Sequence, residues 1–440
     1  MSEAKMNRHY ANITGILAFM AGLSAAAPLI AAGPGQSARP MPRSQPILVA
    51  AAAESREDPV GEAQDDGPGL RAWVLAFRSR ALEAGIDAEV FDRSLNNVSY
   101  DSEVIRRDRN QSEFTKTVWD YLGTATSDLR VQNGKKALAQ WQRTLEDIEA
   151  KFGVEKEVVT AIWGLESAYG SFRGSDSVIN SLATLAYDAR RAEFFEAELL
   201  NALRIVQAGD IEAEQMRGSW AGAMGHTQFM PTSFLAHAVD WDGDGRRDIW
   251  GDDPSDALAS TAAYLKHFGW TKGQPWGIEV ALPADFDYLL ADRSITKSAE
   301  EWAALGLTGL DGKPLEEHGP ASVLLPAGAD GAAFLIYNNF TVIENYNTAD
   351  AYVIGVGHLS DRIAGAGPIL QEWPVEDRAL SFDERIELQT LLTEAGFDTE
   401  KIDAKIGPLT VNAVRRYQQD RGLVPDGYAP PRLLERLRNE

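Results

Sequence analysis

Residues 158–170 read VVTAIWGLESAYG and combine a helical apolar pattern with a single carboxylate. Val159, Ile162, Trp163 and Glu166 are spaced at i, i+3, i+4 and i+7, so they share one face of a predicted helix. Gly170 is expected to cap it, because glycine adopts the left-handed conformation that ends many helices. A carboxylate on an apolar stripe loses hydration, which raises its pKa. Glu166 is therefore a possible general acid, although this pattern alone slightly favours a solvated or salt-bridged glutamate.

Apolar spacing near 3.6 residues predicts further helices around this segment. The helical windows, including the one around Glu166, are 70–84, 134–151, 156–169, 191–208 and 255–268. Runs rich in β-forming residues predict strands at 277–282, 333–337 and 340–343. We therefore expect a mainly α (α+β) chain, with a larger helical domain and small β subdomain at 69–370. A boundary near 365–377 separates it from a compact helical domain at 378–440.

The composition excludes several classes of protein. The 440 residues include 42 basic and 65 acidic side chains, a net charge of −23, which argues against nucleic-acid binding. The chain has no cysteine, so disulfides, thiolate metal sites, a cysteine nucleophile and a lipoprotein anchor are all excluded. A neutral polymer such as a glycan is compatible with this charge.

The first 32 residues are typical of an export signal. A weakly basic head with Lys5 and Arg8 precedes an apolar stretch at 13–30, which is followed by small residues. Glycines and Pro28 make this stretch a poor membrane-spanning helix, so cleavage is favoured over an uncleaved anchor and no stable membrane anchor is expected. Residues 33–68, rich in Pro, Gly, Ala and Ser, are predicted to be a disordered linker. The mature protein is then expected to be periplasmic.

Five stretches in order carry a resemblance to a known family. They are GLESAYG at 164–170, YDARR at 187–191 followed by two phenylalanines, GSWAGAMGHTQFMP at 218–231, residues 240–257, and NNF at 338–340 with Tyr346-Asn347. Together they resemble the B-type lytic murein transglycosylases, over about residues 70–363. The resemblance implies a lysozyme-like helical fold acting on peptidoglycan.

The resemblance also implies a reaction. Such enzymes break the β-1,4 bond between N-acetylmuramic acid and N-acetylglucosamine. Glu166 would protonate the leaving oxygen and then accept the proton of the muramic 6-hydroxyl, which closes on C1 to give a 1,6-anhydro product. One carboxylate is sufficient, unlike the pair of an ordinary glycosidase. A muramidase that uses water and a catalytically silent wall-binding protein are the alternatives.

The same resemblance assigns further site residues. Ser219 and Gln228 would lie beside Glu166 and bind it or the sugar, and Arg190 and Arg191 would meet the muramyl lactyl-peptide. The remaining substrate-binding predictions are Tyr264, Tyr337, Asn339 and Tyr346. Each tyrosine could instead be core, and the arginines could form a structural salt bridge. His226 and His237 are expected to be structural or surface residues.

Residues 240–248 read DWDGDGRRD, a loop of alternating carboxylates. Asp240, Asp242 and Asp244 would converge on a hard cation, expected to be structural Ca²⁺, with Arg246 contributing its backbone carbonyl. Position twelve is Gly251 instead of the usual glutamate. The family resemblance implies Asp256 as the closing ligand, with Asp252 and Asp253 as rivals. The alternative is a solvated loop without metal, and no organic cofactor is expected.

The last sixty residues resemble the peptidoglycan-binding domain of cell-wall hydrolases, a small three-helix fold. The matching stretches are 388–396, 402–410, 413–418, 422–423 and 426–427. Ala404 and Tyr417 depart from the usual Gly and Phe. Peptidoglycan glycan strands are the expected partner, and a generic helical cap on the catalytic domain is the alternative. The sequence indicates no protein partner.

Overall fold

The structure is a computed structural model that describes residues 67–109 and 116–440. The predicted signal peptide, and all of the predicted linker except its last two residues, lie outside the described residues. Helix α2 (Gly67–Glu83) includes the last two residues of the predicted linker, because Pro68 fits the first turn of a helix, where its missing N–H is not needed. No helix in the described ranges is long and apolar enough to cross a bilayer.

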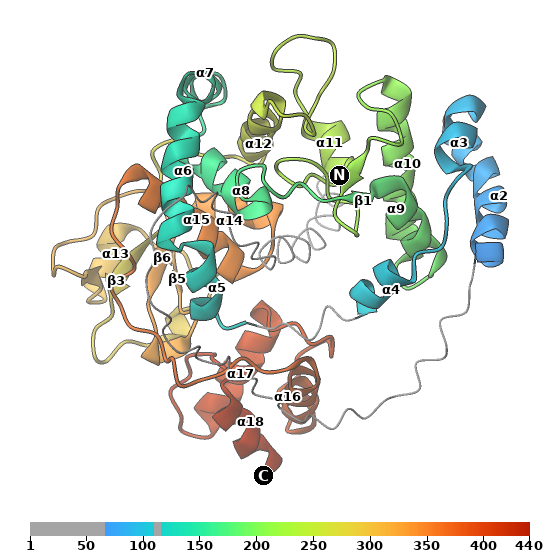
Figure 1. The fold of residues 1–440 in the computed structure, drawn as a ribbon. Helices are drawn as coiled ribbons and strands as arrows, with labels where there is room; N and C mark the ends of the chain where they lie inside the picture. Colours follow the sequence, from blue (N-terminus) through green and yellow to red (C-terminus); the bar gives the residue numbers. More distant parts are fainter. Residues whose placement is uncertain (1–66, 110–115) are drawn as a thin grey trace, which may run out of the picture.

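Most of the chain from α2 to residue 364 is helical. The helices after α2 are α3 (Ala88–Leu95), α4 (Ser102–Arg109), α5 (Val118–Ala125), α6 (Asp128–Gln140), α7 (Gln142–Phe152), α8 (Lys156–Ser167), α9 (Val178–Tyr187), α10 (Ala192–Ala208), α11 (Pro231–His237), α12 (Ser255–His267), α13 (Ala299–Ala304), α14 (Asn338–Tyr346) and α15 (Asp350–Ala364). Figure 1 shows α8 between two groups of elements: α2–α4 with α9 and α10 on one side, and the larger sheet on the other.

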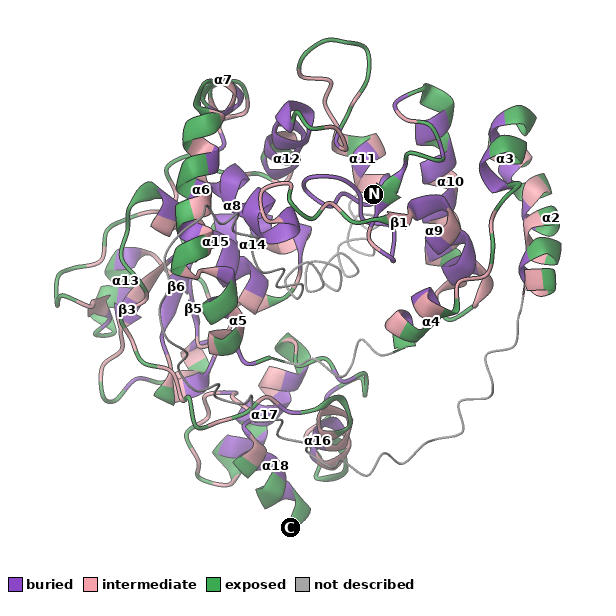
Figure 2. Ribbon diagram, viewed as in Figure 1, coloured by how far each residue is buried: buried purple, intermediate pink, exposed green. Residues whose placement is uncertain are grey.

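Helix α8 is the central element of this domain. Its ten residues 158–167 are all buried, and the helix is purple along most of its length in Figure 2. It packs on α15, α6, α12 and α7. Gly355 of α15 lets α5 come close beside it, since a Cβ there would lie 2.9 Å from the Tyr121 ring of α5. Burial on all sides holds the end of α8, which carries Glu166, in a fixed place.

Two small antiparallel sheets accompany the helices. The larger has the order β4-β3-β6-β5, and Leu335 is paired with Ile278 on one side and with Val323 on the other. Its strands are β3 (Gly277–Ala281), β4 (Thr308–Gly309), β5 (Ser322–Leu324) and β6 (Phe334–Ile336), and the smaller sheet pairs β1 (Asp176–Ser177) with β2 (Arg217–Gly218). The larger sheet has its own apolar core around Trp302, which is fully buried. The expected small β subdomain is therefore present.

Two of the predicted elements are different in the structure. The strand predicted at 340–343 was wrong: these residues lie inside α14, where burial of Asn339, Val342, Ile343 and Tyr346 follows helical spacing. The β-branched run Thr341-Val342-Ile343 suggested a strand, but packing on α15 decided the outcome. The helix predicted at 134–151 is divided at Trp141, between α6 and α7.

The C-terminal domain consists of α16 (Phe382–Glu394), α17 (Pro408–Asp420) and α18 (Pro431–Arg438) around a separate core. Figure 1 shows these helices grouped at the end of the molecule where the chain terminates. The mainly helical fold and the helical C-terminal domain confirm the predicted fold class.

This domain is docked on the β subdomain. The N–H of Ala329 donates to Asp426 at 2.9 Å, Arg415 donates to the carbonyl of Ala291, and Arg432 pairs with Asp330 at 3.2 Å. The two cores are thus joined by directional contacts as well as by the connecting chain.

Candidate active site

Glu166 occupies the last turn of α8 and is 3% exposed. The Tyr352 hydroxyl of α15 donates to its Oε1 at 2.5 Å. Burial raises the pKa of Glu166 to about 8, although the hydrogen bond from Tyr352 opposes the shift by stabilising the carboxylate. The side chain is therefore a carboxylic acid at neutral pH, which the apolar stripe of α8 left open beside a solvated or salt-bridged glutamate.

The other groups that interact with Glu166 are tyrosines. Its charge raises the pKa of the buried Tyr121, Tyr346 and Tyr352, in each case after the larger effect of burial. Within the described residues, no aspartate or glutamate contributes to the pKa shift of Glu166. The site therefore has one carboxyl group in an apolar, hydroxyl-lined setting, and not the close carboxylate pair of an ordinary glycosidase.

The turn after α8 has an unusual backbone. Ala168, Tyr169 and Gly170 are all left-handed, with φ values of 49°, 59° and 83°. The helix ends at Ser167 and its cap is Ala168, so Gly170 is not the cap residue that the sequence suggested. Non-glycine residues in this region store strain, which is retained where function needs a particular geometry. Ser167 holds the turn by donating to the His226 carbonyl and accepting the N–H of Gly170 at 2.9 Å.

Tyr169 locks this turn onto α6. Its hydroxyl donates to the Arg130 carbonyl at 2.8 Å, and the Arg130 guanidinium donates to the carbonyl of Gly164. A Cβ at Gly164 would lie 2.5 Å from the Tyr169 ring. Glycine is thus needed two positions before Glu166 so that this ring can fold back on the helix.

Residues 218–231 form a tight loop whose glycines allow close backbone approach. A Cβ at Gly218 would lie 2.1 Å from the Ala223 carbonyl oxygen, and one at Gly225 would lie 2.2 Å from that of Ile249. Ser219 Oγ accepts the N–H of Ala223 at 3.0 Å. The Gln228 amide donates to the carbonyls of Gly225 (2.8 Å) and Arg173 (3.1 Å).

Neither side chain thus bonds to Glu166 in this structure. Their hydrogen bonds shape the loop against the end of α8. Direct binding of Glu166 or of sugar by Ser219 and Gln228 stays a prediction.

Arg190 and Arg191 both pair with Asp108, which is 1% exposed and lies at the end of α4. Arg190 donates to its carboxylate at 3.0 Å, and Arg191 donates to the other carboxylate oxygen. This is the structural salt bridge that the sequence left open as an alternative. The Arg190 side chain nevertheless keeps 53% of its surface exposed.

The remaining predicted substrate-binding residues are buried. Tyr264 and Tyr346 donate to the carbonyls of Asn345 and Thr227, and Tyr337 packs edge-on against His318 in the β subdomain core. The Asn339 amide donates to the carbonyls of Thr271 and Gln274. These contacts give all four a packing role, and a contact with substrate stays a prediction.

His226 is buried and supports the turn at 168–171 after α8, which is called the catalytic turn below. This is in line with a structural role. Its Nδ1 accepts the indole N–H of Trp163 at 3.1 Å, and its Nε2 lies 2.8 Å from the Gly251 carbonyl. His237 is half-buried and packs its ring on Tyr264, His267 and Phe268.

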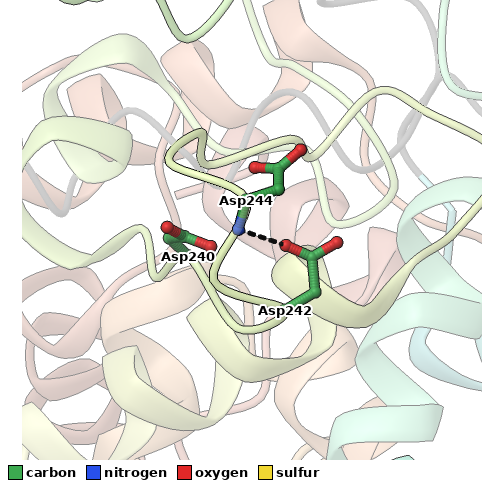
Figure 3. A group of neighbouring side chains, drawn as sticks. All are labelled: Asp240, Asp242 and Asp244. Carbon is green, nitrogen blue, oxygen red and sulfur yellow. Dashed lines mark hydrogen bonds between the residues drawn. The ribbon is translucent and has the colours of Figure 1, made fainter.

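Asp240, Asp242 and Asp244 bring one carboxylate oxygen each within 4.8 Å of one another. Figure 3 shows the three side chains around the loop, with the Asp244 N–H donating to Asp242. Asp256 is outside this trio: its two oxygens accept the N–H groups of Trp241 and Asp248 at 2.8 and 2.7 Å. It therefore closes the loop by hydrogen bonds, and its predicted role as a ligand is untested, as is that of the Arg246 carbonyl.

The sequence analysis missed several residues of this site. Tyr352 is 186 positions from Glu166, and nothing local marks it. Asp108 lies in the highly charged helix α4, where a buried acid cannot be distinguished from its solvated neighbours. Arg130 and Arg173 act through backbone carbonyls, which leave no pattern in the sequence.

Comparison with known proteins decides the family. A model of the transglycosylase SLT domain matches residues 69–361, and one of the putative peptidoglycan binding domain matches residues 382–437. The chain belongs to the SLT transglycosylase family. The predicted resemblance to B-type lytic murein transglycosylases is confirmed: the chain is 36% identical to the membrane-bound lytic murein transglycosylase B of Escherichia coli (strain K12) over 238 residues. That match covers 53% of this chain and about 64% of the relative's length.

Solved structures of this family show the same fold. Pseudomonas aeruginosa SltB3, in complex with NAG-anhNAM-pentapeptide, is 52% identical with a TM-score of 0.81, covering 84% of this chain and 99% of that one. Escherichia coli Slt35, solved in complex with calcium, is 30% identical with a TM-score of 0.58, covering 68% of this chain and 93% of that one. The chain therefore shares the fold of lytic transglycosylases of this family and matches both the SLT domain and the putative peptidoglycan binding domain.

Proposed function

We propose that this SLT transglycosylase cleaves the β-1,4 bond between N-acetylmuramic acid and N-acetylglucosamine and forms a 1,6-anhydro product, with Glu166 as the single acid and base. The observation that carries this proposal is one buried carboxyl group with a pKa of about 8. A protonated acid suits the first step, and the tyrosine-lined surroundings offer no second carboxylate among the described residues. The SltB3 complex with NAG-anhNAM-pentapeptide adds support from a relative.

Two proton transfers at Glu166 account for the reaction. Glu166 first gives its proton to the glycosidic oxygen as the bond from C1 to that oxygen breaks. The resulting carboxylate then takes the proton of the muramic 6-hydroxyl while that oxygen bonds to C1, so no water is consumed. Tyr352 supports the intermediate state because its hydroxyl donates to Oε1, a bond that is stronger when the acceptor is charged.

Product analysis tests this proposal directly. Purified sacculi are digested and the fragments are weighed by mass spectrometry, with 1,6-anhydro ends expected. Reducing ends would instead identify a muramidase that uses water. Glu166→Gln should abolish product formation, whereas Glu198→Gln should retain it, since Glu198 is also buried but bonds to Thr232 of α11. Equal activity of Glu166→Gln and wild type would overturn the assignment of Glu166. Absence of product from both proteins would instead indicate a silent wall-binding protein.

We propose that substrate is bound by the residues to which the family resemblance points. The residues are Ser219, Gln228, Arg190, Arg191, Tyr264, Tyr337, Asn339 and Tyr346. Arg190 is the member with an exposed guanidinium, and it would meet stem-peptide carboxylates. Arg190→Ala should raise the KM for peptide-bearing glycans and leave that for peptide-free chitooligosaccharides unchanged. The buried members would act by shaping the cleft.

The acidic loop fits a structural calcium ion. Three carboxylates within 4.8 Å of one another supply hard oxygen ligands, and Asp256 fastens both ends of the loop. Slt35 was solved in complex with calcium, which supports the same ion here. The ion would hold residues 240–256 in shape and take no part in proton transfer.

The N-terminal residues and the C-terminal domain would determine where the protein acts. A signal peptide at 1–32 would deliver the protein to the periplasm, where its substrate lies, and 33–68 would link it to the catalytic domain at 69–370. The domain at 378–440 would bind peptidoglycan and raise the local enzyme concentration at the wall.

A further inference from the structure

A pocket lies against the turn that follows α8. Its volume is about 400 Å³, within the range of ligand-binding pockets. Its wall is formed by α6, the α6–α7 junction, Trp163 of α8 and the turn 168–171. Glu166 is not among its lining residues, so the pocket is separate from the catalytic carboxyl group although it borders the same turn.

The lining combines aromatic surface with unused hydrogen-bonding groups. Trp141, Trp163 and Tyr169 supply ring surface, while Asn133 and Gln140 supply side-chain amides. Among the described residues, neither amide has a hydrogen-bond partner within the protein, and the same holds for the exposed Lys136 ammonium and Ser171 hydroxyl. Donors and acceptors that line a pocket with aromatic rings can fix the orientation of a polar ligand.

The charges favour a neutral ligand over a polyanion. Lys136 and Arg173 are the cations of the pocket, and Arg173 is already paired with Asp252 at 3.3 Å. Its other guanidinium nitrogen donates to the carbonyls of Trp250 and Gly251, so it is not available for a phosphate. Side-chain amides that line a pocket together with aromatic rings suit a sugar, which presents hydroxyl and acetamido groups at its edge and an apolar face.

We propose that this pocket binds an N-acetylated amino sugar of a peptidoglycan glycan strand, as a second glycan site beside the catalytic turn. The proposal rests on the proposed function for its choice of polymer. The acetamido group would bond to Asn133 and Gln140, and the sugar face would pack on Trp141. A strand held there would add affinity for the wall independently of the C-terminal domain.

The test uses the full chain carrying Glu166→Gln, so that glycans bind without being cleaved. Binding of tri-N-acetylchitotriose is measured by titration calorimetry and tryptophan fluorescence. Binding at the pocket is expected in addition to binding at the catalytic site and at the C-terminal domain. Asn133→Ala with Gln140→Ala should weaken the pocket event about tenfold, as expected for the loss of two hydrogen bonds. The matched control is Gln132→Ala with Lys135→Ala, two exposed residues of α6 outside the pocket lining, and it should keep every event.

A pocket variant that binds as the control does would overturn the proposal, as would a single binding event in all proteins. Failure of the proposed function is recognised separately. In that case wild-type protein would release no anhydro products from sacculi, while a binding event sensitive to Asn133 and Gln140 would persist. Trp141→Phe should give an intermediate loss of affinity, because a smaller ring keeps part of the stacking surface.

Discussion

Glu166 must be protonated when the glycosidic bond breaks, so activity should fall as the pH rises through its pKa of about 8. Tyr352→Phe removes a hydrogen bond that favours the carboxylate, which moves this pKa further up. We therefore expect the alkaline limb of the pH–rate profile to shift to higher pH in this variant, together with a lower maximal rate. Initial rates on a soluble glycan across pH 5 to about 10 measure both effects.

Tyr417→Phe is the control for this experiment, because the Tyr417 hydroxyl bonds to Glu440 in the C-terminal domain. Its profile should match that of wild type. An unchanged alkaline limb in Tyr352→Phe would show that a group other than Glu166 determines this limb of the profile.

The raised pKa of Glu166 also affects stability. A pKa of about 8 in the folded state, against 4.5 for the free group, means that the folded protein holds this proton more tightly than the unfolded chain. Its contribution is constant below pH 4.5 and is lost as the pH rises towards 8. Glu166→Gln should therefore be more stable than wild type at pH 7, by up to about 3 kcal/mol. Thermal melting at pH 5 and pH 7.5 checks this, and an equal Tm difference at both would contradict it.

Single residues were predictable where the signal is local. The i, i+3, i+4, i+7 spacing placed Glu166 on an apolar face of α8, and its burial follows from that. Tyr352, by contrast, reaches Glu166 from a helix 186 residues away. Spacing within one segment carries no information about such a contact, so only the fold identifies Tyr352 as the partner of Glu166.

At the scale of elements, the turn after α8 depends on the absence of a side chain at Gly164. Gly164→Ala would place a Cβ 2.5 Å from the Tyr169 ring, so the ring and the left-handed residues after it must move. We expect a loss of about 1–3 kcal/mol and a large fall in kcat, because Glu166 lies two positions further along. Gly123→Ala is the matched control in α5, where a Cβ meets nothing within 4 Å, and it should be neutral or stabilising. Similar activity of both variants would contradict the argument.

The acidic loop is the second element with a testable role. If calcium holds the loop, EDTA should lower the Tm, since a ligand at about 100 times its Kd adds roughly 2.7 kcal/mol. That is a shift of several degrees for a domain of this size. The variant Asp240→Asn with Asp242→Asn should melt lower than wild type and should not respond to EDTA. Equal melting with and without chelator in wild type, and no bound calcium by elemental analysis, would favour the solvated loop.

Elements were predictable where helical periodicity was strong and long. Four of the five helix windows matched their boundaries to within three residues. The window at 134–151 spans two helices, and the short run at 340–343 was assigned to a strand. Its β-branched residues fit either state, and only packing against α15 distinguishes them. The division of α6 from α7 at Trp141 is similar, because the apolar period continues across the break.

At the scale of the molecule, the C-terminal domain is joined to the catalytic domain by more than a linker. Its contacts with residues 291, 329 and 330 fix its orientation relative to the β subdomain. The sequence predicted a tether that concentrates the enzyme at the wall, but it could not predict this docking, which joins residues about a hundred positions apart. A fixed orientation would align a bound glycan with the catalytic domain as well as hold it nearby.

The contacts between the two domains can be weakened by a substitution in the C-terminal domain. Arg415 is 8% exposed and donates to the carbonyl of Ala291, so Arg415→Met keeps the aliphatic stem and removes one of the three polar contacts between the domains. We expect the segment 365–381 to be cleaved several-fold faster by a protease and calorimetry to resolve two unfolding transitions, with sacculus binding unchanged. Arg416→Met is the control, since Arg416 bonds to Asp398 within its own domain, and it should behave as wild type. Equal protease sensitivity of the two variants would contradict this role of the Arg415 bond. If the C-terminal domain were only a flexible tether, the segment 365–381 would already be open to the protease in wild type.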